Sequence, residues 1–287
     1  MTDVRAAGRH PAASTTKFAE LSRGGAFSVA GVLAALNAHA DHILMDLTWQ
    51  RPLDALLNLG GVSAVMWAAM LVAWKIGGES DQPLRGTLDR VVLALVILLS
   101  FVPISYAAQA GLLLCACYLL MTAGRQGDAE RRSAIILLAL TGPLIWGRLL
   151  LRVFEAPILS LDAHLAGAAI GSRVDGNMVR FADGSGIMVI GDPCSSVHNM
   201  SIAIVLWTTA AMLFKIRIDR QYVTVGIAMA ASMFALNIVR LSMIGLFPDH
   251  FEFLHVGDGA TMFAWAGLII ASLIAGFGVV HADARQR

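Results

Sequence analysis

Long apolar segments separated by short polar stretches constrain the fold of this 287-residue chain more than any other feature. A helix of about 20 apolar residues crosses the ~30 Å hydrocarbon core of a bilayer and satisfies its own backbone hydrogen bonds there. Charged residues make up only 14% of the sequence, whereas soluble domains contain about 25%. The pattern predicts an all-α polytopic membrane protein with about eight transmembrane helices. The expected spans lie near residues 27–45, 54–74, 91–102, 107–123, 133–153, 196–214, 222–246 and 259–280.

The distribution of basic residues predicts how these helices are oriented. Most of the 21 Lys and Arg residues fall in the N-terminal tail, in the segments 75–90, 124–132 and 215–220, and at the C-terminus. Because cytoplasmic loops carry an excess of Lys and Arg, we expect these regions on the cytoplasmic side. The net charge of +1 gives no indication of nucleic-acid binding. The expected organisation is a cytoplasmic tail (1–26), N-terminal transmembrane helices (27–132), a core (133–280) with an outer loop (154–194), and a second cytoplasmic tail (281–287).

The outer loop 154–194 is expected to contain secondary structure of its own. Residues 157–170 have the pattern of a short amphipathic helix at the membrane interface. Two turn signals and two strand-like segments follow, and they predict a small β-hairpin that leads the chain to Cys194. These are the turns Asp175-Gly176 and Asp183-Gly184 and the strands Asn177–Phe181 and Ile187–Ile190.

Cys194 ends the longest polar stretch of the chain, directly before an apolar segment. We expect Asp192 to cap the following helix and Pro193 to occupy its first position. Cys194 would then lie in the first turn, where free amides and the positive end of the helix dipole favour a thiolate. From these residues alone, Cys194 is either a nucleophile or a small interfacial apolar side chain. Cys115 and Cys117 lie inside an apolar run and are expected to be inert.

Arg240 interrupts another apolar segment, about 9 Å below its expected outer end. A charge within a span costs about 2.5 kcal/mol or more, so it indicates a functional site unless the side chain snorkels to the head groups. Asn237 lies one helical turn earlier on the same face. His255 stands in the short loop before the last span, and histidine is suited to moving a proton near neutral pH. His250 and His198 are rival candidates for this base.

Two further clusters carry residue types found in sites. Arg148 and Arg152, at the outer end of the fifth span, would either hold an anionic group of a substrate or anchor to lipid phosphate. His39, Asp41 and His42 have metal-ligand residue types near the outer end of the first span. A polar interfacial edge explains that cluster more simply, and we expect no metal or other cofactor.

The order of these residues resembles the exosortase/archaeosortase family of membrane cysteine proteases and transpeptidases. The shared features are a β-containing outer loop ending in a cysteine, Asn-x-x-Arg late in the second span after it, and a histidine before the last span. The resemblance covers about residues 133–280. Two positions depart from the family pattern, because Ser196 stands where glycine is usual and Pro193 where alanine is common. The departures indicate a divergent subfamily.

The resemblance implies a role for each candidate residue. Cys194 would be the nucleophile, Arg240 would stabilise the oxyanion or orient the thiol, and His255 would be the general acid and base. The other candidates are expected to bind substrate: Asn237, His198, Arg148 and Arg152.

The family's implied activity is cleavage of a C-terminal sorting signal on exported, membrane-anchored proteins. The cleavage proceeds through a thioester, and the product passes to an acceptor such as a glycan or a lipid. The site would face the extracytoplasmic side of the inner (plasma) membrane.

Two other functions are open at this point. A non-catalytic or transport component of envelope polysaccharide export would use Arg240, Arg148 and Arg152 to line an anionic path. A metal-dependent membrane hydrolase would use the cluster of residues 39–42.

Overall fold

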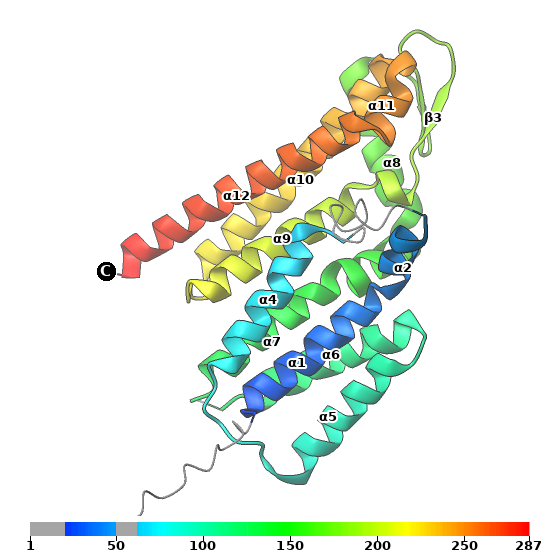
Figure 1. Ribbon diagram of the computed structural model, residues 1–287. Coiled ribbons are helices and arrows are strands. Elements are labelled where there is room, and N and C mark those ends of the chain that lie inside the picture. Colours follow the sequence, from blue (N-terminus) through cyan, green and yellow to red (C-terminus); the bar gives the residue numbers. More distant parts are fainter. Residues whose placement is uncertain (1–20, 50–61, 125, 287) are drawn as a thin grey trace, which may run out of the picture.

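The computed structural model describes residues 21–49, 62–124 and 126–286, which form a bundle of helices with a small sheet at one end (Figure 1). The longer helices are α1 (Arg23–Ala38), α2 (Ala40–Trp49), α4 (Ala64–Gly78), α5 (Gly86–Phe101), α6 (Ser105–Thr122), α7 (Asp128–Thr141), α8 (Gly147–Ile170), α9 (Ser196–Leu213), α10 (Arg220–Leu246) and α12 (Asp258–Gln286). The short helical elements are η2 (Gly142–Trp146), η3 (Asp192–Cys194), η4 (Pro248–His250) and α11 (Phe251–His255). The strands are β1 (Val174–Asp175), β2 (Met178–Arg180) and β3 (Ile187–Val189).

Helices cover most of the described residues of the predicted apolar segments, and residues 54–61 of the second segment lie outside the described residues. α4 is apolar but shorter than a full span, and α1 and α5 have 16 residues each. The all-α polytopic fold is therefore confirmed, whereas the number of eight spans stays a prediction. Within the described ranges, five helical segments are long and apolar enough to cross a membrane: Ser105–Thr122, Asp128–Ile170, Ser196–Leu213, Arg220–Leu246 and Asp258–Ala282.

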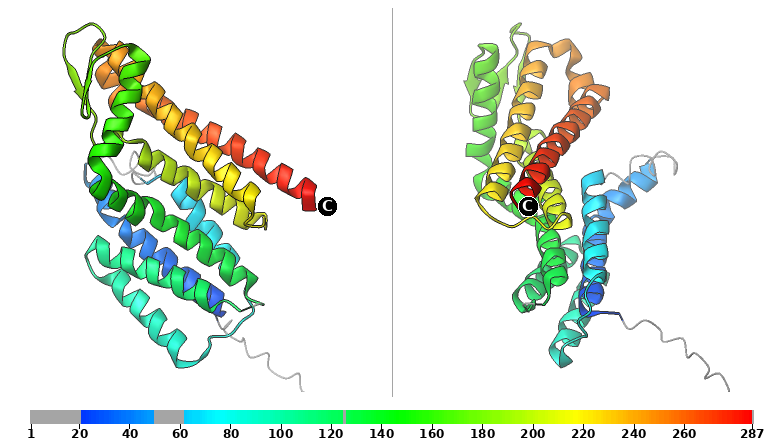
Figure 2. Two further views of the ribbon diagram at one scale, coloured as in Figure 1. Left: turned by 180° about the vertical axis from the view of Figure 1, so that it is seen from behind. Right: turned by 90° about the vertical axis from the view of Figure 1, so that its left-hand side faces the viewer.

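α8 continues from α7 and α2 from α1 without a reversal, whereas the other successive long helices alternate in direction (Figure 2). The connections between them fall at two opposite ends of the bundle. We call the end with the β-sheet and α11 the sheet end, and the end where α12 finishes the basic end. The exposed side chains of Lys75, Arg131 and Arg217 belong to the basic end, at the close of α4, the start of α7 and the α9–α10 connection. The assignment of this end to the cytoplasm rests on the charge rule and stays a prediction.

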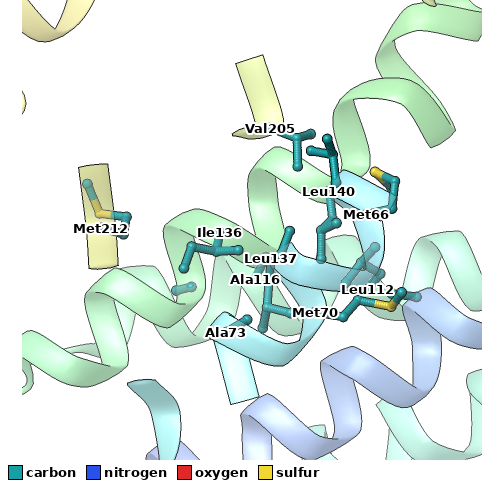
Figure 3. Packing of buried hydrophobic residues seen from close by; sticks show 14 of the residues in the cluster. Met66, Met70, Ala73, Leu112, Ala116, Ile136, Leu137, Leu140, Val205 and Met212 are labelled. Atoms are coloured by element: carbon teal, nitrogen blue, oxygen red, sulfur yellow. The ribbon is translucent and has the colours of Figure 1, made fainter. Parts of the chain in front are cut away.

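The larger apolar core lies among α1, α4, α6 and α7, and parts of α9, α10 and α12 extend it. Figure 3 shows Met66 and Met70 of α4 near Leu112 of α6 and near Leu137 and Leu140 of α7. All five side chains are buried. Van der Waals packing of this kind holds helices together in lipid, where the hydrophobic effect between them is weak.

Two glycines allow α1 and α4 to approach closely near the basic end. A Cβ on Gly77 of α4 would lie 2.8 Å from the backbone oxygen of Gly24 and 1.7 Å from the Oγ of Ser28. Only hydrogen fits at this position, so the α1–α4 contact depends on Gly77.

Arg23 opens α1 and is fully buried, although the sequence led us to expect a cytoplasmic tail up to residue 26. Its Nε lies 2.8 Å from an oxygen of Asp89 on α5, and its Nη1 lies 2.5 Å from Glu130 on α7. Thr122 accepts a further hydrogen bond from Arg23, and the Tyr118 hydroxyl donates to Asp89 at 2.6 Å. The burial is tolerated because each charge is both paired and hydrogen-bonded. The cytoplasmic location of residues 1–26 stays a prediction, and the local polar composition reveals none of these distant partners of Arg23.

Residues 157–170 are helical as predicted, and they lie in the second of two helical segments that α8 joins across a kink. The kink, at Phe154 (φ −120°, ψ 30°), joins this segment to the first. Pro157 explains the kink, since it lacks an N–H and its ring crowds the preceding turn. The position of residues 157–170 at the membrane interface stays a prediction.

The predicted hairpin is present with one additional strand. β2 pairs antiparallel with β3, with Val179 opposite Met188, and the two-residue β1 pairs with the other edge of β2. Gly176 and Gly184 adopt φ values of 57° and 76°, as the predicted turns require. β1 is too short to show the alternation by which a strand is recognised in a sequence.

A second, smaller apolar cluster holds the sheet end together. Its buried side chains include Leu159 of α8, Val179 of β2, Val197 of α9 and Leu254 of α11. Cys194 packs against this cluster. Because the cluster joins elements far apart in the sequence, it sets the positions of the chain segments around Cys194.

Candidate active site

Cys194 is the last residue of the 3-10 turn η3, just before α9. This differs from the expected local structure, because Ser195 and not Asp192 caps α9, with its Oγ accepting from the Val197 N–H at 3.3 Å. Pro193 occupies the first positions of η3 and not of α9. Cys194 therefore precedes the first turn of α9, and its chemistry depends on its side-chain neighbours more than on free amides.

The closest partner of the Cys194 thiol is an imidazole from the other side of the site. Sγ lies 3.2 Å from Nε2 of His255, which ends α11. Phe251 stacks on the His255 ring with centroids 5.0 Å apart, which restricts the orientation of the ring. Both Cys194 and His255 are half-buried. A thiol and a histidine in hydrogen-bond contact can form a thiolate–imidazolium pair, the activated form of a cysteine nucleophile.

Arg240 reaches the same site from α10, and it contacts the backbone of α11. Its Nε donates to the Leu254 carbonyl at 3.1 Å and its Nη2 to the His255 carbonyl at 2.7 Å. The guanidinium thus holds the segment that carries the imidazole. Among the described residues Arg240 makes no other hydrogen bond, so the N–H groups of Nη1 remain available to donate to a bound molecule.

Asn237 lies one turn before Arg240, and only 3% of it is exposed. Its Nδ2 donates to the Cys194 carbonyl at 2.9 Å. Asn237 and Arg240 share one face of α10, as predicted, and this face contacts the backbone of both Cys194 and His255. The sequence suggested substrate binding for Asn237, and the structure adds a contact with the backbone of Cys194.

Asp162 is a site residue that sequence reasoning missed. It is fully buried on α8, and its carboxylate accepts from the Ser196 N–H at 3.2 Å and from the Ser196 Oγ at 3.1 Å. The signal available in the sequence was a single acid within the largely apolar segment 157–170. Nothing in that segment identifies a partner 34 residues later.

A cavity of about 660 Å³ lies beside the pair, between α4, α9, α10 and α12. Asn237 and Arg240, which contact the pair on one side, line this cavity as well. Most of its wall is apolar and includes Leu206, Phe263 and Trp265. The cavity can therefore accept an apolar segment of a bound molecule next to the Cys194–His255 pair.

The other predicted substrate-binding residues are more dispersed. His198 lines both this cavity and a second one of about 230 Å³, and Arg148 lines only the second. Arg152 is exposed and lines neither cavity. The rival base His250 is exposed in η4, and its ring packs edge-on against Phe247. Each of these two cavities is lined by only one of the arginines expected to line an anionic path, Arg240 in the larger and Arg148 in the smaller.

The possible metal cluster near residue 40 receives no support from the described residues. His39 is buried, with Nδ1 2.8 Å from the Ala35 carbonyl, and Asp41 is exposed. The His42 side chain lies outside what the structure describes. In the described ranges, no group of three or more His, Cys, Asp or Glu side chains could hold a metal ion.

The helices and the site together define a multi-pass membrane protein with a paired thiol and imidazole at one end of its bundle. Comparison with protein families adds that residues 61–272 match the family model for transmembrane exosortases, and the chain belongs to this family. Exosortases are in general membrane transpeptidases of the cysteine type. The match begins before α4, well ahead of residue 133, where the resemblance in the sequence starts. Neither the search of curated proteins nor the search of solved structures found a match.

Proposed function

We propose that this protein is a membrane-embedded cysteine protease and transpeptidase. It cleaves a C-terminal sorting signal of exported proteins and transfers the product to an acceptor. The observation that carries the proposal is the 3.2 Å contact between Cys194 Sγ and His255 Nε2, made by residues 61 apart in the chain. Nucleophilic cysteines are activated by an adjacent base in this way. The proposed location is the inner membrane, with the sheet end facing the extracytoplasmic side.

The first half of the reaction forms a thioester. His255 Nε2 takes the proton of the Cys194 thiol, and Sγ attacks the carbonyl carbon at the cleavage site. The tetrahedral intermediate carries a negative charge on the former carbonyl oxygen. His255 then donates its proton to the leaving amine, and the C–N bond breaks. Cys194 is left acylated by the new C-terminus.

The second half regenerates the thiol. An acceptor hydroxyl or amine gives its proton to His255 and attacks the thioester carbonyl. The C–S bond breaks, and the sulfur leaves as a thiolate that recovers the proton from His255. A glycan, a lipid or water fits this step by its chemistry, since each supplies an O–H or N–H group.

Arg240 has two proposed tasks in this scheme. Its Nε and Nη2 hold the backbone of Leu254 and His255. The donors of Nη1 are able to stabilise the oxyanion, and hydrogen bonds aimed at developing charge contribute strongly to catalysis. The apolar cavity beside Arg240 supports a substrate with an apolar helix next to its cleavage site.

Replacement of the thiol tests the proposal in cells. We expect Cys194→Ala and Cys194→Ser to accumulate membrane proteins that retain one C-terminal span and a Lys/Arg-rich tail. The double variant Cys115→Ala, Cys117→Ala is the matched control and should process them normally, because both cysteines lie within α6, away from the site. Mass spectrometry of the membrane fraction compares the amount of unprocessed precursor between the Cys194 variants and the control. Equal maturation in the Cys194→Ala strain and the control would refute the thioester mechanism.

A further inference from the structure

The buried carboxylate of Asp162 has no role in the mechanism above, and its surroundings require an explanation. Asp162 is 0% exposed and lies beside the apolar cluster of the sheet end, between Leu159 and Ala163 on the inner side of α8. Within the described residues, no Lys, Arg or His forms an ion pair with it. Burying a carboxylate without a cation is unfavourable unless hydrogen bonds compensate. An apolar side chain would serve packing alone at lower cost.

Within the described residues, Asp162 accepts hydrogen bonds at the start of α9, from Ser196 above all and also from the Ser195 hydroxyl. One oxygen accepts from the Ser196 N–H at 3.2 Å and the other from the Ser196 hydroxyl at 3.1 Å. Ser196 is the first residue of α9, two positions after Cys194. The carboxylate therefore fixes both the backbone and the side chain of the residue that follows the Cys194 turn.

The Cys194 turn is also held from the opposite side. Asn237 of α10 donates to the Cys194 carbonyl at 2.9 Å. Two buried side chains from two helices, Asp162 and Asn237, thus bracket the three residues 194–196. Arg240 in turn holds the backbone of the partner base. The backbone at Cys194 and at His255 is therefore anchored on each side of the pair by a polar side chain.

We propose that Asp162 is a positioning residue that acts through Ser196. It holds the Cys194 turn where Sγ meets His255 Nε2. The inference concerns the geometry of the proposed catalytic pair and rests on the proposed function for its importance. It assigns no contact between Asp162 and substrate.

The test measures how fast Cys194 reacts with N-ethylmaleimide at pH 7, in the full-length protein with Cys115→Ala and Cys117→Ala. We expect His255 to raise this rate, because an adjacent base activates a cysteine nucleophile. We expect Asp162→Ala to lower the rate on the order of tenfold, as expected for the loss of a hydrogen bond to a charged group. In a His255→Ala background, Asp162→Ala should have no further effect, because both changes then remove the same interaction.

Asp162→Asn separates geometry from charge. Its amide can still accept from the Ser196 N–H and donate to the Ser196 hydroxyl, so we expect a rate within about threefold of the parent. If Asp162→Asn loses as much as Asp162→Ala, the negative charge is responsible and the positioning role is wrong. A fall of equal size with and without His255, or a faster reaction in Asp162→Ala, would also overturn it.

Two further variants account for general loss of stability. Asp89→Ala removes an equally buried carboxylate at the basic end, and it should leave the reaction rate of Cys194 unchanged even though it lowers thermal stability. If Asp162→Ala does not fold, Ser196→Ala decides, since it removes one of the two bonds from Ser196 and should slow the reaction about two- to fivefold. The measurement needs no substrate. A failure of the positioning role is thus distinguishable from a failure of the proposed function, which the processing experiment tests separately.

Discussion

Arg240 holds His255 by its main chain, with Nη2 2.7 Å from the His255 carbonyl oxygen, while the imidazole of the same residue faces the Cys194 thiol. A cation within an apolar helix is costly, and here it anchors the segment that carries His255. Snorkelling to head groups would leave this pair of carbonyl contacts unexplained. Arg240 thus ties α10 to the backbone segment that places His255 next to Cys194.

Arg240→Lys should therefore lose most of the processing activity. A lysine has one compact ammonium and cannot reproduce the two parallel contacts with Leu254 and His255. Loss of one charge-assisted hydrogen bond costs about 1.5–3 kcal/mol, which is about 10- to 100-fold in rate. We expect the fall in kcat, with KM little changed. Arg217→Lys, at an exposed arginine of the α9–α10 connection, is the control and should retain the parent rate. An Arg240→Lys variant with the parent kcat would show that only a charge is needed.

The position of the pair could be predicted from the sequence, because it follows from topology. Alternating spans place the start of α9 and the end of α10 at the same end, and the short connection after α10 brings His255 with them. The identity of the anchors could not be predicted. The partners of Asp162, Asn237 and Arg240 are backbone or hydroxyl groups 14 to 43 residues away, and such contacts leave no periodic pattern in the chain.

The buried polar contacts at the basic end could not be predicted from the sequence either. Apolar periodicity indicates where helices lie, but it does not identify the polar residues that helices bury. Asp89 and Glu130 lie 66 and 107 residues from Arg23. The burial of Arg23 at the start of α1 depends on tertiary contacts that composition does not reveal.

Arg23→Met should destabilise the protein strongly. It removes the only cation that the structure shows between the buried carboxylates of Asp89 and Glu130 within the described residues. Breaking a buried ion pair in this way costs about 3–5 kcal/mol. A fall in the thermal unfolding midpoint in detergent would measure the effect. Arg131→Met, at an exposed arginine of α7, is the control. Adding Asp89→Asn and Glu130→Gln to Arg23→Met should restore part of the loss, and no restoration would contradict the ion-pair explanation.

Gly77→Ala and Gly78→Ala form a matched pair at the end of α4. The Cβ of Gly77→Ala would meet the Ser28 Oγ, which is itself held by a 2.7 Å hydrogen bond to Ser133, and the backbone of Gly24. We expect a cost of about 1–3 kcal/mol from this overpacking. Gly78→Ala meets nothing within 4 Å and should be neutral or stabilise by up to about 1 kcal/mol. Equal unfolding midpoints in detergent for the two variants would rule out a close α1–α4 contact.

Labelling of introduced cysteines in intact cells tests the orientation of the bundle. Lys75, Arg131 and Arg217 are exposed at the basic end, and Asp183 is exposed in the β2–β3 turn at the sheet end. In a chain with Cys115→Ala, Cys117→Ala and Cys194→Ala, we expect Asp183→Cys to react with a membrane-impermeant maleimide. Lys75→Cys, Arg131→Cys and Arg217→Cys should react only after the cells are permeabilised, because the charge rule places them in the cytoplasm. The reverse pattern would put the Cys194–His255 pair on the cytoplasmic face, where it could not act on exported proteins after their translocation.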